Sequence, residues 1–352
     1  MQQPKRILVC PLDWGLGHAT RCIPIINYLL EKKSEVVIAA SGRPLELLKQ
    51  EFPQLDFVDF EGYRIDYSGT LPMAVKMAMS VPGILKRIKE EQKELEDIIT
   101  RKRIDIVISD NRYGCHDSRT KNIFITHQLM IKAPLGEKAL HKRVLSYLEN
   151  YDECWVPDVE GEQNLSGDLS HKFPLPKNAY FIGPLSRFSF GEISIKPAYD
   201  VMAIISGPEP QRTIFEKIIM DQVYKTNLKV FIVKGIPEQT EHHSTTDIRI
   251  QSHIGTSEMQ NEILRSKIVI SRPGYSTVMD LCALGMKAIF VPTPGQTEQE
   301  YLAKYYKKQK IAYFQDQSDF NLAEALKESI NYRGFEPLES GAFKNRVDIL
   351  LK

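Results

Sequence analysis

The sequence lacks the features that mark several large classes of protein. Its 352 residues contain no apolar run near the roughly 20 residues that a membrane span requires. No secretory signal is recognisable, because the basic residues Lys5 and Arg6 precede an apolar run of only Ile7 to Cys10. A formal net charge of +1 argues against a nucleic-acid-binding protein, which usually carries a strongly basic domain. These absences predict a soluble globular protein with no nucleic-acid partner.

Cysteine is scarce, and metal-binding patterns are missing. The five cysteines have no close spacing, which predicts reduced, buried thiols and a cytoplasmic location rather than a disulfide framework. They are Cys10, Cys22, Cys115, Cys154 and Cys282. No Asp-x-Asp pair is present to hold a divalent ion, and Glu94-x-Glu96 lies in a charged helical run. His242 and His243 have no Cys or His partner at metal spacing, so no metal site is predicted.

Length and composition predict two globular domains. A chain of 352 residues is too long for one ordinary core, and 42% hydrophobic residues are typical of a globular protein. We expect an N-terminal domain at 1–183, a linker at 184–199, a second domain at 200–334 and a C-terminal segment at 335–352. The last helix, from Ala342 to Lys352, is expected to cross back onto the first domain and to bury Val347, Ile349, Leu350 and Leu351 there.

Short apolar runs that end at turn residues predict buried strands of parallel sheets. In the first half they are 6–10, 35–40, 56–60, 104–109, 122–126, 152–156 and 180–182. In the second half they are 200–205, 228–233, 248–251, 267–270 and 287–291. Open α/β folds bind ligands at the carboxyl ends of such strands. Polar residues that follow the strands are therefore the candidate site residues.

One stretch, from Ser271 to Tyr301, organises the second half. The strand at 267–270 ends in a Pro-Gly turn, after which Ser276 and Thr277 are expected to cap a helix that Gly285 terminates. A strand, a glycine turn and a helix N-terminus that meet at one point form an anion site. The turn at Ser206-Gly207 predicts a second such site at a helix start.

The same stretch resembles the donor-nucleotide signature of family 28 glycosyltransferases. The signature positions are matched in order by Arg272, Gly274, Ser276, Thr277, Asp280, Pro292 and Gln299. The resemblance implies that 274–277 receive the diphosphate of a nucleotide sugar and that Asp280 binds the ribose hydroxyls. It also implies that Gln299 contacts the ribose or the transferred sugar, and that 252–256 hold the base through their backbone. The donor-binding residues predicted in this way are Ser206, Gly207, Ile254, Arg272, Gly274, Tyr275, Ser276, Thr277, Asp280, Gln296 and Gln299.

Arg272 and Asp280 also allow plainer interpretations. Arg272 could serve as a structural ion-pair partner, and Asp280 could be an N3 helix residue that the helix dipole favours.

The first strand leads into a loop with Gly15 and Gly17. A dinucleotide site is not predicted there, because Thr20 replaces the third glycine of that fingerprint and strand 35–40 ends without a carboxylate. The stretch from Trp14 to Arg21 instead resembles the N-terminal Gly-x-Gly-His loop of the same glycosyltransferase group, which faces the acceptor. With its arginine it is most similar to uncharacterised bacterial and archaeal members. The predicted acceptor-side residues are Gly15, Gly17, Arg21, Asn111 and Arg112.

A glycosyl transfer needs a base that removes the proton of the acceptor hydroxyl, and four residues are candidates. They are Asp13, His18, Asp110 and His127. His18 opens a helix, where the dipole disfavours the imidazolium ion and keeps the ring available as a base. Asp13 could instead bond its own backbone, Asp110 could be a helix cap, and His127 could be an interior histidine.

Together these features predict the GT-B arrangement, with two Rossmann-like domains that face each other. The predicted activity is inverting, metal-independent transfer from a UDP-sugar to a hydroxyl acceptor that could be lipid-linked or a cell-envelope glycan, with no cofactor. Two alternatives stay open: a nucleotide-sugar 2-epimerase of the same fold and a non-catalytic nucleotide-sugar-binding protein.

A methionine-rich apolar stretch from Leu71 to Leu85 is followed by Lys86, Arg87 and Lys89. This arrangement is typical of a segment that rests on an anionic membrane surface or covers a lipid-like acceptor. The alternative is a core helix followed by a solvated charged one.

Overall fold

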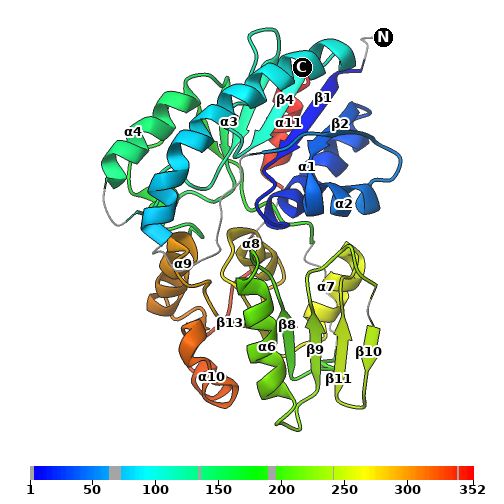
Figure 1. Cartoon of the computed structure of the whole chain (residues 1–352), viewed down its shortest axis with the longest axis vertical. Coiled ribbons are helices and arrows are strands. Elements are labelled where there is room, and N and C mark those ends of the chain that lie inside the picture. Colours follow the sequence, from blue (N-terminus) through cyan, green and yellow to red (C-terminus); the bar gives the residue numbers. More distant parts are fainter. Residues whose placement is uncertain (1–3, 63–72, 134–135, 189–195, 241, 339–340) are drawn as a thin grey trace. The chain divides into compact units, whose positions relative to one another are not determined.

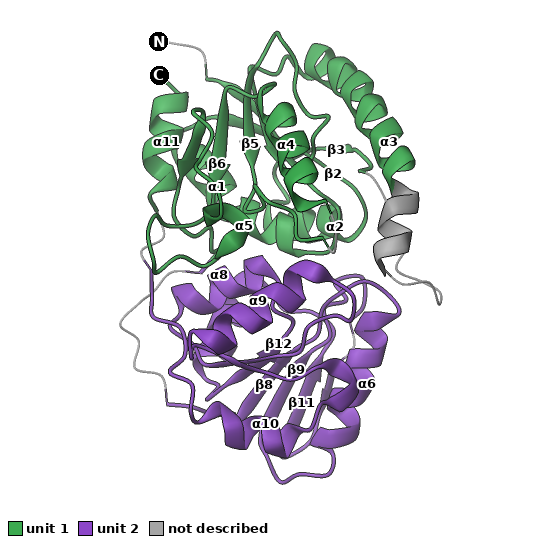
Figure 2. Ribbon diagram, turned by 90° about the vertical axis from the view of Figure 1, so that its left-hand side faces the viewer, with its two compact units in different colours: residues 1–66, 74–187, 339–352 green, residues 67–73, 188–338 purple. Residues whose placement is uncertain are grey.

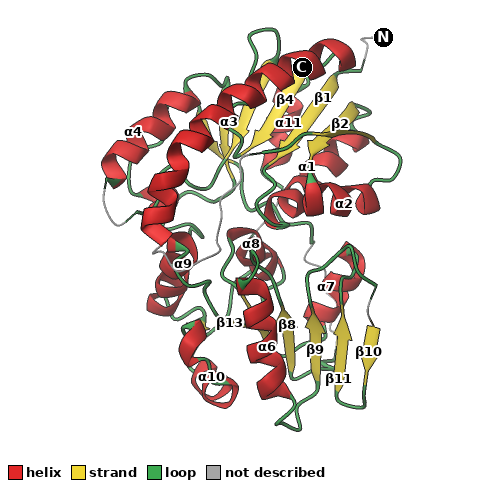
Figure 3. Cartoon of the chain, viewed as in Figure 1, coloured by secondary structure: helices red, strands yellow, loops and turns green. Residues whose placement is uncertain are grey.

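The computed structural model describes residues 4–62, 73–133, 136–188, 196–240, 242–338 and 341–352, with the side chains of 73–80 left out. The chain divides into two compact units (Figure 2). The described part of unit 1 falls within 1–66, 74–187 and 339–352, and that of unit 2 lies mainly within 188–338. Each unit has its own sheet of mainly parallel strands with helices on both faces (Figure 3), so the predicted α/β class is confirmed.

Unit 1 contains a seven-stranded sheet in which all neighbouring strands are parallel. The strands are β1 (Arg6–Pro11), β2 (Glu35–Ala40), β3 (Asp56–Asp59), β4 (Ile106–Asp110), β5 (Lys121–Ile125), β6 (Glu153–Val156) and β7 (Ala179–Phe181). Their order across the sheet is β3-β2-β1-β4-β5-β6-β7. The central strands β1 and β4 are buried over nearly their whole length, because helices cover both faces of the sheet.

Six helices of unit 1 lie in the described part of the chain. They are α1 (Gly17–Glu31), α2 (Gly42–Glu51), α3 (Met73–Lys102), α4 (Glu137–Leu148), α5 (Asp168–His171) and α11 (Phe343–Leu350). The strand register places Leu8, Val107 and Phe124 on one face of the sheet. Leu95 of α3 lies in one buried cluster with Leu8 and Val107, and Val144 of α4 lies in another with Phe124. Helix α1 packs against β1 and β2 and against α11 (Figure 1).

Unit 2 contains a second seven-stranded sheet, of order β10-β11-β9-β8-β12-β13-β14. The strands are β8 (Val201–Ile204), β9 (Val230–Val233), β10 (His242–Ser244), β11 (Ile248–Gln251), β12 (Val269–Ser271), β13 (Ala288–Phe290) and β14 (Tyr313–Phe314). All pairs are parallel except β10 with β11, which is antiparallel. The sequence reasoning missed β10 and β14, because the first is wholly exposed and the second has only two residues.

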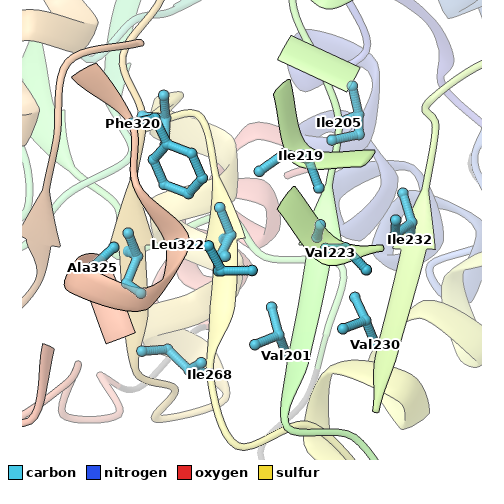
Figure 4. Close-up of a cluster of buried hydrophobic side chains, with 14 of the residues drawn as sticks. Val201, Ile205, Ile219, Val223, Val230, Ile232, Ile268, Phe320, Leu322 and Ala325 are labelled. Atoms are coloured by element: carbon cyan, nitrogen blue, oxygen red, sulfur yellow. The ribbon is translucent and has the colours of Figure 1, made fainter. Parts of the chain in front are cut away.

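The helices of unit 2 enclose its core. They are α6 (Gln211–Val223), α7 (Thr256–Leu264), α8 (Tyr275–Ala283), α9 (Thr297–Lys308) and α10 (Leu322–Ser329), with the short 3-10 helix η1 (Gln317–Asp319). Figure 4 shows Ile219 and Val223 of α6 lying over Val201 and Val230 of the sheet, next to Leu322 of α10. One face of the sheet is thus sealed by α6 and α10.

The C-terminal helix α11 belongs to unit 1, as expected for this fold. Its Asp348 accepts a hydrogen bond from the Tyr28 hydroxyl of α1 at 3.0 Å and pairs with Lys32 at 2.7 Å. Of the four apolar residues expected to be buried, only Val347 is. Ile349 is 51% exposed, because the helix turns that position away from α1.

In both sheets the strand order reverses at one point, where the chain leaves the first strand to either side. This switch point lies between β1 and β4 in unit 1 and between β8 and β12 in unit 2. Open α/β sheets bind their ligands outside the carboxyl ends of the strands at such a point. The loops that follow these four strands are therefore the place to look for a site in each unit.

No helix in the described part of the chain is long and apolar enough to span a bilayer. The first two residues of the apolar stretch from Leu71 to Leu85 lie outside the described residues, and the side chains of 73–80 are not described. Residues 189–195 of the expected linker also lie outside the described residues.

Candidate functional site

Four polar side chains meet at the switch point of unit 1, and we call them the base cluster: His18, Arg21, Asp110 and His127. His18 and Arg21 lie one turn apart on α1, so both project from the same face of that helix. Asp110 is the last residue of β4, and His127 follows β5, the next strand in the sheet. Parallel pairing brings these strand ends together, as the sequence predicted.

His18 and Asp110 form the central contact of the base cluster. His18 Nδ1 lies 2.8 Å from Asp110 Oδ1. The Asp110 side chain is fully buried, whereas the His18 side chain is 15% exposed. Because a carboxylate can only accept, Nδ1 donates and the lone pair of Nε2 is left for another group. This arrangement suits His18 to take a proton from a hydroxyl.

Arg21 was expected in the acceptor-side loop, but it lies within helix α1 and is buried. Its side chain is 2% exposed, and both Nε and Nη2 donate to the carboxylate of Asp110. Its Nη1 lies 3.0 Å from His127 Nδ1. Burial raises the pKa of Asp110, but Arg21 and His18 outweigh this and hold it well below its usual range. Asp110 is therefore an ionised strand residue and not a helix cap.

Asp13 connects the first loop to another segment of unit 1. Its Oδ2 accepts a hydrogen bond from the backbone N–H of Gly62 at 3.0 Å, so it does not merely bond its own backbone. Gly62 has no room for a side chain, since a Cβ there would lie 2.3 Å from Asp13 Oδ1. That oxygen is buried and has no hydrogen-bond partner in the described part of the chain. In the described residues, no hydrogen bond or ion pair joins the Asp13 side chain to the base cluster.

The other acceptor-side residues lie near the base cluster along the chain. Gly15 has φ of +75° and Asn111 has φ of +58°, so both loops turn sharply just after their strands. Gly17 starts α1, and its carbonyl accepts a hydrogen bond from the Thr20 hydroxyl at 3.0 Å. Thr20, which replaces the third glycine of a dinucleotide fingerprint, thus stabilises the first turn of the helix.

Arg112, expected on the acceptor side, is a buried structural residue. Its side chain is fully buried, and its Nε donates to Glu91 Oε1 of α3 at 2.9 Å. The guanidinium also donates to the carbonyls of Phe60 and Glu61, at 2.8 and 2.6 Å, and stacks on the Phe60 ring. Glu91, in a helix that looks solvated and charged from the sequence, is the buried partner that sequence reasoning missed. Local sequence patterns could not identify this pair, because Glu91 and Arg112 lie 21 positions apart in the chain.

Arg272 is a buried charged residue at the switch point of unit 2, directly after β12. Its side chain is buried and stacks on the Phe215 ring at 4.1 Å. The terminal nitrogens donate to the carbonyls of 291–292 and of Gln211, and to Gln317 Oε1. Burial lowers the pKa of Arg272 to about 9, with no carboxylate of the described residues to offset it. Arg272 is thus not the ion-pair partner that the sequence left open.

Three residues at this switch point form what we call the anion cradle: Gly207, Arg272 and Thr293. Arg272 Nε and Thr293 Oγ1 are buried and have no hydrogen-bond partner in the described part of the chain. A Cβ at Gly207 would lie 4.0 Å from the first atom and 3.7 Å from the second. The absent side chain at Gly207 therefore leaves room beside two unsatisfied polar atoms, one of them on a cation.

The helix that follows Arg272 starts earlier than expected. Gly274 is the N-cap of α8 and makes no side-chain capping bond, so Ser276 and Thr277 lie within the first turn and do not cap it. Gly285, with φ of +64°, ends the helix as predicted. Asp280 is the sixth residue of α8 and 9% exposed, which excludes the interpretation as an N3 residue.

The two glutamines predicted to bind the donor have internal roles. Gln296 is the N-cap of α9, and its side chain accepts from the backbone N–H of Gln299 at 3.2 Å. Gln299 Oε1 accepts from the backbone N–H of Thr293 at 2.8 Å and so fixes the loop that carries the cradle hydroxyl. Tyr275 and Ile254 are buried at 3% and 4% exposure.

The Ser206-Gly207 turn does not start a helix directly. Helix α6 begins at Gln211, and its first amide groups already donate to Pro208 O and to the Glu209 carboxylate. Its N-terminus is therefore occupied by the protein, and the expected helix-start anion site is wrong in that respect. What the turn contributes is Gly207 itself, with φ of +120°.

Comparisons with known proteins place the chain among glycosyltransferases. Residues 214–342 match the family model described as glycosyltransferase family 28 C-terminal domain. An uncharacterized glycosyltransferase of Methanosarcina acetivorans is 25% identical over 332 residues, which cover 84% of this chain and 79% of that protein. A UDP-N-acetylglucosamine--N-acetylmuramyl-(pentapeptide) pyrophosphoryl-undecaprenol N-acetylglucosamine transferase of Campylobacter jejuni subsp. doylei is 31% identical over 121 residues, or 32% of this chain and 34% of that one.

Solved structures show the same fold at low identity. The glycosyltransferase SnogD from Streptomyces nogalater has a TM-score of 0.61 and 14% identity, with 99% of this chain and 100% of that chain covered. MurG of Acinetobacter baumannii has a TM-score of 0.54 and 12% identity, with 99% of each chain covered.

Proposed function

Since the chain is a glycosyltransferase of the family 28 type with the GT-B fold, we propose that it transfers a sugar from a UDP-sugar to a hydroxyl acceptor. The proposal includes inversion at the anomeric carbon and no requirement for a metal ion. In it, unit 1 supplies the base and unit 2 holds the donor. The observation that carries it is the pair of His18 and Asp110, with the 2.8 Å bond to the buried carboxylate and the histidine as the exposed member.

The base step follows from that pair. The proton of the acceptor hydroxyl passes to His18 Nε2, while Nδ1–H stays bonded to Asp110. The hydroxyl oxygen forms a bond to the anomeric carbon as the bond from that carbon to the diphosphate oxygen breaks. One displacement inverts the anomeric configuration, and UDP leaves with the electron pair. A positioned general base of this kind typically contributes a factor of about 10² to 10⁴ in rate.

The departing diphosphate needs positive charge and hydrogen-bond donors. Arg272 offers a buried cation with an unsatisfied Nε, and Thr293 offers a hydroxyl beside the gap at Gly207. The first turn of α8 has no side-chain cap and adds the positive end of a helix dipole. Asp280 on the same helix would bind the ribose hydroxyls. In this mechanism the cradle stabilises the charge that develops on the leaving group.

The acceptor is proposed to be a hydroxyl on a lipid-linked or cell-envelope glycan, as in the name of the Campylobacter relative. Two exposed apolar residues of α3, Val81 and Leu85, support contact with a lipid surface. The nearby basic residues are largely neutralised by acidic residues of the same helix, because Arg87 pairs with Glu94 at 2.6 Å and Lys86 lies 3.5 Å from Glu90. Any attraction to anionic lipid is therefore expected to be weak.

Two substitutions test the division of roles. His18→Ala should lower turnover of a UDP-sugar by about two to four orders of magnitude and leave UDP affinity unchanged, since it removes only the base. Asp280→Ala should weaken UDP binding about ten- to a hundredfold, because the ribose loses charge-assisted hydrogen bonds. Calorimetry with UDP and a screen of UDP-sugars with hydroxyl acceptors measure both effects.

Four outcomes would redirect the proposal. Near-normal turnover in a folded His18→Ala protein would move the base to Asp13 or His127. Loss of UDP binding on addition of EDTA would contradict the metal-free mechanism. Donor turnover without any acceptor would indicate an epimerase, and donor binding without turnover across the acceptor panel would indicate a binding protein.

A further inference from the structure

Arg21 has more polar contacts than an ion pair with Asp110 alone would give it. Its guanidinium donates twice to Asp110, lies 3.0 Å from His127 Nδ1 through Nη1, and approaches His18 Nδ1 to 2.9 Å through Nη2. These contacts are shielded from solvent, since Arg21 and Asp110 are buried. The cation therefore contacts both the carboxylate that orients the base and the base itself.

The hydrogen-bond pattern sets the protonation of both histidine rings. A guanidinium has donors only, so His127 Nδ1 must accept from Arg21 and the ring proton sits on Nε2. His18 has the opposite pattern. Its Nδ1 lies 2.8 Å from Asp110 Oδ1, which can only accept, and Arg21 Nη2, 2.9 Å from this Nδ1, donates to the same oxygen. Both nitrogens therefore act as donors to Asp110, and His18 Nδ1 carries the proton. With its proton fixed on Nδ1, His18 has its free lone pair on Nε2.

Electrostatics act in the same direction. An ionised Asp110 alone would stabilise the imidazolium form of His18, and a base that is already protonated cannot accept a proton. Arg21 cancels that charge through two hydrogen bonds and places its own positive charge beside the ring. The other titratable groups behind this contact are Cys22 of α1, whose Sγ faces Asp110, and His127 after β5. Burial raises the pKa of the Cys22 thiol, so it stays neutral.

We propose that Arg21 is a positioning residue: it shares the Asp110 carboxylate with His18, holds the ring with its proton on Nδ1 and its lone pair on Nε2, and offsets the negative charge of Asp110 beside that ring. Its catalytic consequence rests on the proposed function, whereas its effect on the ring protons does not. Arg21 itself does not touch the reacting atoms. It acts through Asp110 and His18.

Nuclear magnetic resonance of the imidazole nitrogens tests this directly in the full-length protein, with His18→Gln and His127→Gln variants to assign the signals. In Arg21→Gln the pKa of His18 should rise by about one to three pH units, because a nearby cation is lost and a carboxylate is left uncompensated. Arg21→Lys keeps the charge and should rescue most of the shift. A pKa of His18 that is the same in Arg21→Gln as in the native protein would overturn the proposal.

A second pair of variants keeps the test valid if Arg21→Gln does not fold, since it strands a buried carboxylate. Asp110→Asn retains Arg21 beside His18, and Arg21→Gln/Asp110→Asn removes both charges. The pKa of His18 should be lower in the single variant than in the double one by about one unit or more. Equal values would refute a direct effect of the Arg21 charge. The nitrogen signals of the native protein must also report Nδ1–H for His18 and Nε2–H for His127.

Activity separates this proposal from the proposed function. If the chain is a transferase, the acid limb of its profile of kcat/KM against pH should move upward in Arg21→Gln by the shift seen in the resonance titration. A purely structural role for Arg21 would lower activity at every pH alike, which counts against the proposal. A resonance shift in a protein without transferase activity would leave Arg21 assigned and remove the proposed function instead.

Discussion

The substitution Gly207→Ala probes the anion cradle with a single methyl group. Gly207 has φ of +120°, and a Cβ there would lie 3.7 Å from Thr293 Oγ1 and 4.0 Å from Arg272 Nε. These distances are ordinary van der Waals contacts, so the methyl group fits without displacing protein atoms. It does occupy the space beside the two unsatisfied polar atoms. The backbone strain of alanine at this φ costs about 1–3 kcal/mol, which a two-domain protein of this size should tolerate.

The expected effect is on phosphate recognition alone. A phosphate oxygen that cannot approach Arg272 Nε or Thr293 Oγ1 loses a charge-assisted hydrogen bond, worth roughly 1.5–3 kcal/mol. UDP affinity should therefore fall about ten- to a hundredfold. Uridine carries no phosphate, so its affinity should not change. Calorimetry with UDP and uridine on the same protein measures both.

A matched control separates the cradle from backbone strain. Gly161 of unit 1 has φ of +95°, and a Cβ there would have no atom within 4 Å, so Gly161→Ala introduces similar strain without filling any space. It should lower the melting temperature comparably and leave UDP affinity intact. Unchanged UDP affinity in folded Gly207→Ala, or an equal loss for uridine, would refute the assignment of the cradle to the diphosphate.

Two further predictions concern unit 1. Glu91→Ala leaves Arg112 buried without its carboxylate and should lower the free energy of unfolding by about 3–5 kcal/mol in urea titrations. Glu94→Ala on the same helix breaks an exposed pair and should lower the free energy of unfolding by less than about 1 kcal/mol. Equal losses would contradict the buried-pair argument. The full-length protein should co-sediment weakly with anionic vesicles at low salt and less at high salt, through the exposed Val81 and Leu85 of α3 and the neighbouring basic residues. No binding at low salt would leave α3 as a helix of the core alone.

Most of the fold could be predicted because buried parallel strands are distinct in sequence. Strand β2 was predicted at 35–40 and is observed there, since six mostly apolar residues end at a serine before a helix. Strand β10 could not be found, because all of its residues are exposed and its position depends only on pairing with β11. The starts of α6 and α8 were misplaced because a proline-rich turn and a glycine cap gave no side-chain signal.

The candidate site was predictable in position but not in partnership. His18 and Asp110 could be placed at one sheet edge because His18 follows β1, Asp110 ends β4, and these two strands pair in parallel. The roles of Arg21 and Arg112 could not, because the carboxylate partner of the first lies 89 positions away and that of the second 21 positions away. Local spacing says which elements form, whereas the match of buried charges depends on how those elements pack.

Three of the buried arginines, Arg21, Arg112 and Arg272, show why that match matters for function. Arg21 and Arg112 each have a carboxylate within hydrogen-bonding distance, so the protein itself neutralises them. Arg272 has only neutral acceptors and an aromatic ring in the described residues, and one of its nitrogens has no hydrogen-bond partner there. A buried charge without a counter-ion costs several kcal/mol. An anion that binds beside Gly207 would supply the missing charge, and in the proposed function that anion is the diphosphate of the UDP-sugar.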